Sequence, residues 1–149
     1  MLLKELCTPD VVSCAADRSA LHAARLMRQH HVGDVIVVED AESDPSPLGI
    51  VTDRDIVVEV LGKELDPARV TLRQIMRRPV VIASMSEEVA QAVERMKFHG
   101  VRRIPVVDEA SKLVGVLSLD DLLKQLAADA ANLAAVVIQE QDREHRTRR

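Results

Sequence analysis

Two short motifs of the sequence place a hydroxyl and a carboxylate three residues apart. The first is Thr52 with Asp55, and the second is Ser118 with Asp121. At the start of a helix, such a hydroxyl lies beside backbone N–H groups that have no partner in the helix, where a phosphate is stabilised. One helical turn later, the carboxylate returns to the same face and can accept both hydroxyl hydrogens of a ribose. The spacing therefore indicates two candidate sites for a phosphorylated ribose compound.

The same spacing also has a purely structural interpretation. Ser or Thr followed three residues later by an acid is the capping pattern of an ordinary helix start, and this pattern is far more common than a ligand site. The neighbouring Asp53 and Asp120 also suit a helix start, because the helix dipole favours acids there. We keep both among the candidate ligand-binding residues, and both interpretations remain open at this point.

The two motifs belong to an internal repeat. An offset of 69 residues lays Met27 on Met96 and Val37 on Val106, and the offset becomes 66 at Gly49, which falls on Gly115. One repeat of about 60 residues is too small to bury much core, so we expect the two copies to pack against each other.

Each copy predicts the element order β-α-β-β-α. The first copy has apolar strands at 11–12, 35–38 and 49–51, and the second has them at 80–82, 104–107 and 113–117. Asp17 and Ser86 are expected to cap the first helix of each copy, and Gly100 to end it in the second. The last helix of each copy begins near Asp53 and near Leu119.

At these residues the chain resembles a tandem pair of cystathionine-β-synthase (CBS) domains, also called a Bateman module. The resemblance covers about residues 3–127 and is most specific at the segments 49–55, 100–108 and 115–121. It implies an α+β fold of two β-α-β-β-α CBS repeats packed as a pseudo-two-fold pair, with a C-terminal helical extension. We place the first repeat at 1–66, the second at 67–127, and the helical extension with its polar tail at 128–149.

The resemblance also implies a regulatory fold that binds adenosyl compounds in clefts between the repeats. Candidate ligands are AMP, ADP, ATP and S-adenosylmethionine, with dinucleotides of the NAD type in some members, and no cofactor is required. A basic residue before the second strand of a repeat often reaches the phosphates, and here it is Arg103. The adenine is expected on aliphatic walls near Val12, Ser13, Val81 and Ile82, because the chain has no Tyr or Trp.

We do not expect the two clefts to be equivalent. The first copy has Asp34 at the position of Arg103, and a carboxylate near a phosphate is unfavourable. The cleft of Ser118, Asp121 and Arg103 should therefore prefer a phosphorylated ligand. The Thr52/Asp55 cleft is expected to be empty, or to take an uncharged or cationic adenosyl group. Arg103 with Arg102 could equally be a solvated pair at a turn.

Composition excludes several classes of protein. The chain has 149 residues, a formal charge of −4 and Phe98 as its one aromatic residue, which argues against nucleic-acid binding. The 130–138 segment is too short to span a membrane, and Lys4 and Glu5 interrupt any signal sequence, so we expect a cytoplasmic protein. The two cysteines, Cys7 and Cys14, are expected to be small core residues.

No catalytic or metal-binding arrangement is recognisable in the sequence. The histidines lack Cys or carboxylate neighbours at metal-ligand spacing, so we expect neither a zinc site nor catalytic residues, and the chain is not expected to be an enzyme. A nucleotide hydrolase, for example, would need a metal site and a base.

A long C-terminal helix is predicted from Leu119 to about Glu140, with an apolar stripe through Leu126, Leu133 and Val137. The stripe could dock back onto the module or pair with a second subunit, and we favour a homodimer because the family commonly forms one. The tail from Asp142 is expected to be a frayed terminus. We therefore expect a stand-alone sensor of adenine nucleotides that signals occupancy to an unidentified effector protein. The alternative is a structural interaction module whose clefts bind nothing.

Overall fold

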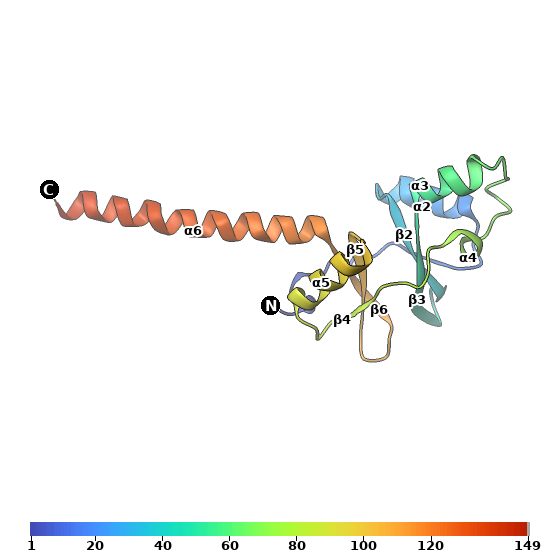
Figure 1. Ribbon diagram of the computed structural model, residues 1–149, viewed down its shortest axis with the longest axis horizontal. Helices are drawn as coiled ribbons and strands as arrows, with labels where there is room; N and C mark the ends of the chain where they lie inside the picture. The colour runs from blue at the N-terminus through green and yellow to red at the C-terminus, as the bar shows by residue number, and fades with distance from the viewer. Residues whose placement is uncertain (149) are drawn as a thin grey trace. The chain divides into compact units, whose positions relative to one another are not determined.

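The computed structural model describes residues 1–148 and contains two three-stranded sheets (Figure 1). In both sheets the first two strands are parallel, and in the first sheet the second and third strands are antiparallel. The strand order is β1 (Ser13–Ala15), β2 (Asp34–Asp40) and β3 (Asp44–Thr52) in one sheet, and β4 (Ala83–Ser84), β5 (Arg103–Val107) and β6 (Leu113–Ser118) in the other.

The helices complete two copies of the predicted β-α-β-β-α order. Helices α2 (Ala20–His30) and α5 (Val89–His99) connect the parallel strands. Helix α3 (Asp53–Ile56) follows β3 and continues into the π-helical turn η1 (Val57–Leu61), and α6 (Leu119–Thr147) follows β6. The α+β fold predicted from the repeat is confirmed. Two four-residue helices, α1 (Leu3–Leu6) and α4 (Leu72–Ile75), were not predicted.

The helix ends correct two details of the sequence prediction. Ser19, not Asp17, caps α2 by accepting a hydrogen bond from the backbone N–H of His22 at 3.1 Å. Glu88, not Ser86, occupies the N-cap position of α5. In both repeats the turn before the helix is therefore two residues longer than expected. Gly100 ends α5 with φ +62°, as predicted, because glycine adopts this left-handed conformation without strain.

Each repeat gives its first residues to the other repeat. The N-terminal segment hydrogen-bonds to the second copy, with Leu3 N–H donating to Glu87 O at 2.9 Å and Thr8 N–H to Val116 O at 2.9 Å. The segment around α4 bonds to the first copy in the same way, since Arg77 N–H donates to the carbonyl oxygen of Ile50 at 3.0 Å. Thr8 and Arg77 are equivalent by the 69-residue offset, so the exchange is reciprocal.

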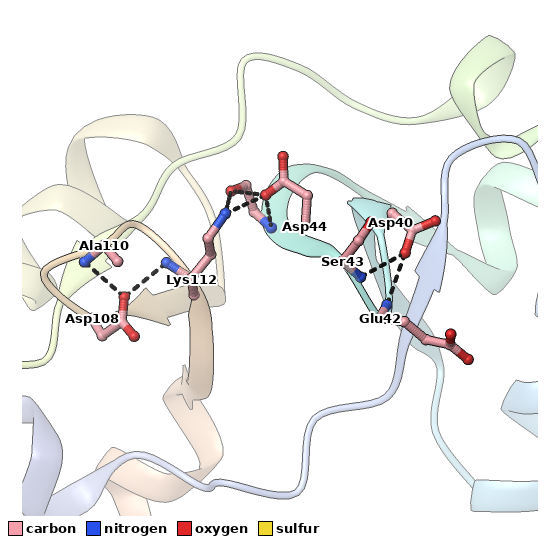
Figure 2. A network of polar contacts seen from close by, with 8 residues as sticks. Asp40, Glu42, Ser43, Asp44, Asp108, Ala110 and Lys112 are labelled. Carbon is pink, nitrogen blue, oxygen red and sulfur yellow. Dashed lines mark hydrogen bonds and ion pairs between the residues drawn. The ribbon is translucent and has the colours of Figure 1, made fainter.

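The turns that join the last two strands of each repeat also meet (Figure 2). In one turn the Asp40 carboxylate accepts the backbone N–H groups of Glu42 and Ser43, and in the other the Asp108 carboxylate accepts those of Ala110 and Lys112. The Lys112 ammonium group donates to Asp44 Oδ1 at 2.5 Å and to Ser46 Oγ at 3.2 Å. These contacts between corresponding turns are what a pseudo-two-fold arrangement requires.

The chain divides into two compact units, residues 1–117 and the segment from Ser118 onward. The first unit holds a core of aliphatic side chains, including the fully buried Val35, Val37 and Val51. Cys14 is buried, as predicted, whereas Phe98 is 86% exposed and contributes no ring to the core. In the second unit, α6 is one continuous helix that ends at Thr147, seven residues beyond the predicted end. Across residues 1–148, no helix is both long and apolar enough to cross a bilayer.

Candidate functional site

The first hydroxyl–carboxylate motif forms a reciprocal helix cap at the end of β3. The backbone N–H of Asp55 donates to Thr52 Oγ1 at 3.1 Å, and the backbone N–H of Thr52 donates to Asp55 Oδ2 at 2.9 Å. Asp53, the first residue of α3, accepts a hydrogen bond from Arg54 N–H at 2.7 Å through Oδ1. The structural interpretation of this motif is therefore satisfied, and the cap positions the Asp55 carboxylate one turn into the helix.

The Asp55 carboxylate is buried and ion-paired. Asp55 is 6% exposed, and its Oδ1 accepts hydrogen bonds from Arg77 Nε at 3.0 Å and Arg77 Nη2 at 2.9 Å. Arg77 reaches Asp55 because its backbone is held to Ile50 by the exchange of segments between the repeats. Arg77 was not among the site residues predicted from the sequence. The available signal was a positively charged residue where the first repeat has Thr8.

A second ion pair joins Asp34 of the first repeat to Arg103 of the second repeat. Arg103 Nε lies 2.9 Å from Asp34 Oδ2, and Nη1 donates to Oδ1 at 3.4 Å. These two residues are equivalent in the repeat, and equivalent residues meet only close to a two-fold axis. Burial raises the pKa of the Asp34 carboxyl, Arg103 lowers it in part, and the negative charge of Asp53 raises it further. Arg103 is thus held by a carboxylate of the first repeat.

An open pocket of about 490 Å³ lies in the first repeat. Its walls include Val12 and Ser13, both predicted to contact adenine, together with Leu26, His30 and Val32. Val32 is followed by Gly33, whose carbonyl oxygen accepts the backbone N–H of Asp53 at 2.9 Å. Val32 is thus two positions before Asp34 in the chain, but neither Asp34 nor Asp53 lines the pocket. Its volume falls in the range of about 300–1,000 Å³ typical of small-molecule sites.

The second hydroxyl–carboxylate motif forms the corresponding cap of α6. Asp121 N–H donates to Ser118 Oγ at 3.1 Å, and Ser118 Oγ donates in turn to Asp121 Oδ2 at 2.5 Å. Ser118 N–H also donates to Oδ2, at 3.2 Å. Asp120 is the exposed second residue of the helix. These residues belong to the second compact unit, so a shared site with Arg103 remains a prediction.

The remaining predicted residues, Val81 and Ile82, lie just before β4 and are half-buried. The carbonyl oxygen of Ile82 accepts a hydrogen bond from Arg95 Nη1 at 2.6 Å, and Arg95 is also paired with Glu87 at 2.9 Å. The proposed contact of Val81 and Ile82 with adenine remains a prediction. Within residues 1–148, no cluster of three or more His, Cys, Asp or Glu side chains is placed to hold a metal ion.

The comparison with known sequences identifies both repeats. The CBS domain model matches residues 3–62 and 72–128. The uncharacterized protein MK0525 of Methanopyrus kandleri is 35% identical over 120 residues, which are 80% of this chain and 60% of that protein. The CBS domain-containing protein YhcV of Bacillus subtilis is 30% identical over 141 residues, which are 94% of this chain and 96% of YhcV. The chain thus spans 60% of the length of the first relative and nearly all of the second.

Solved structures share the fold. The crystal structure of Hypoxic Response Protein I with two coordinated zinc ions has a TM-score of 0.74 at 26% identity, over 83% of this chain and 98% of that one. The CBS domain protein PAE2072 from Pyrobaculum aerophilum, complexed with AMP, has a TM-score of 0.72 at 26% identity, over 86% of this chain and 99% of that one. With two matches to the family model on two structurally equivalent repeats, the chain belongs to the CBS domain family as a tandem pair.

Proposed function

We propose that the protein is a regulatory module that binds an adenine nucleotide between its two CBS repeats and is not an enzyme. The observation that carries the proposal is the open pocket at Val12 and Ser13. Its walls include the aliphatic Val12, Leu26 and Val32, which suit an adenine ring. Val32 is joined through Gly33 to Asp53, at the start of the helix that carries the buried Asp55 carboxylate. The AMP complex of PAE2072 supports this class of ligand.

The proposed ligands are AMP, ADP and ATP, with S-adenosylmethionine as a further adenosyl candidate. Asp55 and Asp121 would each accept the hydroxyl groups of a ribose, and Arg103 would bind phosphate after exchanging Asp34 for it. A phosphate is a suitable replacement for Asp34, because guanidinium groups bind both anions through paired hydrogen bonds. The nucleotide would thereby change the contacts between the two repeats, and a partner protein could respond to that change.

A thermal-shift titration tests the proposal. Wild type is heated with AMP, ADP, ATP or S-adenosylmethionine, alongside the variants Asp55→Ala and Asp121→Ala. A ligand at about 100 times its Kd adds about 2.7 kcal/mol to the free energy of unfolding, which raises Tm by several degrees. We expect a shift with AMP or ATP that is reduced in Asp121→Ala and in Asp55→Ala, because each variant loses one of the two ribose-binding carboxylates, while Glu109→Ala in an exposed turn retains the full shift.

The alternative function is a structural interaction module. The satisfied caps at Thr52 and Ser118 favour it, because both motifs already have a structural role without a ligand. If none of the four ligands shifts the Tm of folded protein, this alternative replaces our proposal. A homodimer and a cytoplasmic location are part of either version and remain predictions.

A further inference from the structure

Arg77 limits what the Asp55 carboxylate can bind. A carboxylate oxygen accepts about two hydrogen bonds, and Asp55 Oδ1 already receives two, from Arg77 Nε and Nη2. The other oxygen, Oδ2, receives the Thr52 backbone N–H. One acceptor position is left for the two hydroxyl groups of a ribose. A ribosyl ligand can therefore use Asp55 fully only after Arg77 has moved away.

The backbone of Arg77 is fixed, but its side chain is not enclosed. Its N–H donates to the Ile50 carbonyl at 3.0 Å, and Gly49 approaches its carbonyl so closely that an added Cβ would lie 2.8 Å from it. The side chain of Arg77 is 66% exposed, whereas that of Asp55 is 9% exposed. The guanidinium group can consequently turn into solvent without disturbing the packing, but it would leave a buried carboxylate without its cation.

The other repeat has no such cation at the equivalent position. There the residue is Thr8, whose backbone pairs with Val116 just as that of Arg77 pairs with Ile50. The hydroxyl group of threonine carries no charge and cannot form an ion pair. Of these two equivalent positions, the one that crosses β3 near Asp55 carries a positive charge and the one that crosses β6 does not.

We propose that Arg77 determines the ligand specificity of the Asp55 cleft, by selecting phosphorylated over unphosphorylated adenosyl compounds. A nucleoside would break the ion pair and offer the guanidinium group nothing in return. A nucleotide offers its phosphate to Arg77 and its ribose to Asp55, so both charged groups keep a partner. This inference rests on the proposed function, because it takes Asp55 to be a ribose-binding residue. From Asp34 alone, we expected the Thr52/Asp55 cleft to be empty or to take an uncharged or cationic adenosyl group. That expectation did not take Arg77 into account, and with Arg77 the preference is reversed.

The test compares AMP with adenosine by isothermal titration calorimetry. To isolate the Asp55 cleft, the measurements use Asp121→Ala and the double variant Asp121→Ala/Arg77→Gln. In Asp121→Ala we expect AMP to bind at least about tenfold more tightly than adenosine. In the double variant, adenosine should bind about tenfold more tightly than before, and the preference for AMP should largely disappear.

The matched control is Arg78→Gln in the Asp121→Ala background. Arg78 is also exposed, but its Nη2 donates only a long hydrogen bond to the Arg73 carbonyl at 3.5 Å, so its loss should leave the AMP preference unchanged. Arg77→Lys provides a second variant if the glutamine variant does not fold. It keeps the positive charge without the paired hydrogen bonds, and its AMP preference should be intermediate.

The outcomes separate this inference from the proposed function. If the ratio of AMP to adenosine affinity is the same in Asp121→Ala and in the double variant, the inference is overturned while nucleotide binding stands. If wild type binds AMP through Asp121 but the double variant binds neither ligand, Arg77 is not what limits the Asp55 cleft, and the inference also fails. If neither wild type nor any variant binds AMP or adenosine, both the proposed function and this inference fail.

Discussion

At the scale of single residues, the burial of the Asp34 carboxyl makes the stability of the protein depend on pH. Burial raises the pKa of the Asp34 carboxyl, and Arg103 offsets this only in part. A carboxyl group whose pKa is higher in the folded than in the unfolded protein binds its proton more tightly when folded. Its ionisation therefore destabilises the fold, and this cost develops as the pH rises from about 4 through the raised pKa.

We predict that Asp34→Asn becomes more stable relative to wild type as the pH rises from about 4 to about 7, because asparagine has no proton to lose. Urea denaturation at several pH values measures this difference. Asp44→Asn is a control of opposite sign, since the hydrogen bond from Lys112 lowers the pKa of Asp44 and its contribution is lost as the pH falls. A stability difference for Asp34→Asn that shrinks with rising pH would contradict the prediction.

Among the local interactions, the helix caps expected at Asp17 and Ser86 were wrong by two residues, and those at Thr52 and Ser118 were correct. The caps at Thr52 and Ser118 join residues three positions apart, so their spacing was sufficient to locate them. The pair of Arg77 with Asp55 joins residues 22 positions apart. It depends on the path of the crossing segment, which no local pattern encodes. The contact of Asp34 with Arg103 was predictable from the repeat, because equivalent residues meet wherever a two-fold axis passes close to them.

At the scale of elements, the two motif glycines are explained by the exchanged segments. An added Cβ at Gly49 in β3 would lie 2.8 Å from the Arg77 carbonyl oxygen, and one at Gly115 in β6 would lie 2.9 Å from Cys7 Sγ. Each glycine thus allows a segment of the other repeat to cross its strand closely. The repeat shows in the sequence that the two glycines are equivalent. Their role depends on the segments that contain α1 and α4, and these helices are too short to show helical periodicity.

We predict that Gly49→Ala destabilises the protein by about 1–3 kcal/mol, because the Arg77 carbonyl belongs to the backbone and cannot move aside easily. Gly33→Ala is the matched control. Its Cβ would lie 3.4 Å from the Asp53 side chain, an ordinary contact distance, and the change should cost much less. Thermal unfolding followed by circular dichroism measures both, and equal losses of Tm would rule out close crossing as the role of Gly49.

At the scale of the whole molecule, α6 presents an apolar stripe that its own unit does not cover. The helix has 29 residues, and none of them is buried. Leu126, Leu133 and Val137, three residues of the predicted stripe, are 65%, 71% and 53% exposed. The sequence predicted the stripe because helical periodicity is a local property. The helix runs on to Thr147 through polar residues that have no such periodicity, and the prediction stopped short of them.

We predict that two chains associate through this stripe, because pairing removes large leucine side chains from water at about 1.5–3 kcal/mol each. Light scattering after size-exclusion chromatography should give wild type the mass of two 16.5 kDa chains. Leu126→Lys combined with Leu133→Lys should give the mass of one, since the added charges cannot be buried in the interface. Gln125→Lys combined with Asn132→Lys adds the same charge to another face of the helix and should remain a dimer. A wild-type monomer would mean that the stripe docks on its own chain. A dimer that survives the leucine substitutions would place the interface elsewhere. The next surface to substitute would then be the exposed side chains of η1, Val57, Val58 and Leu61.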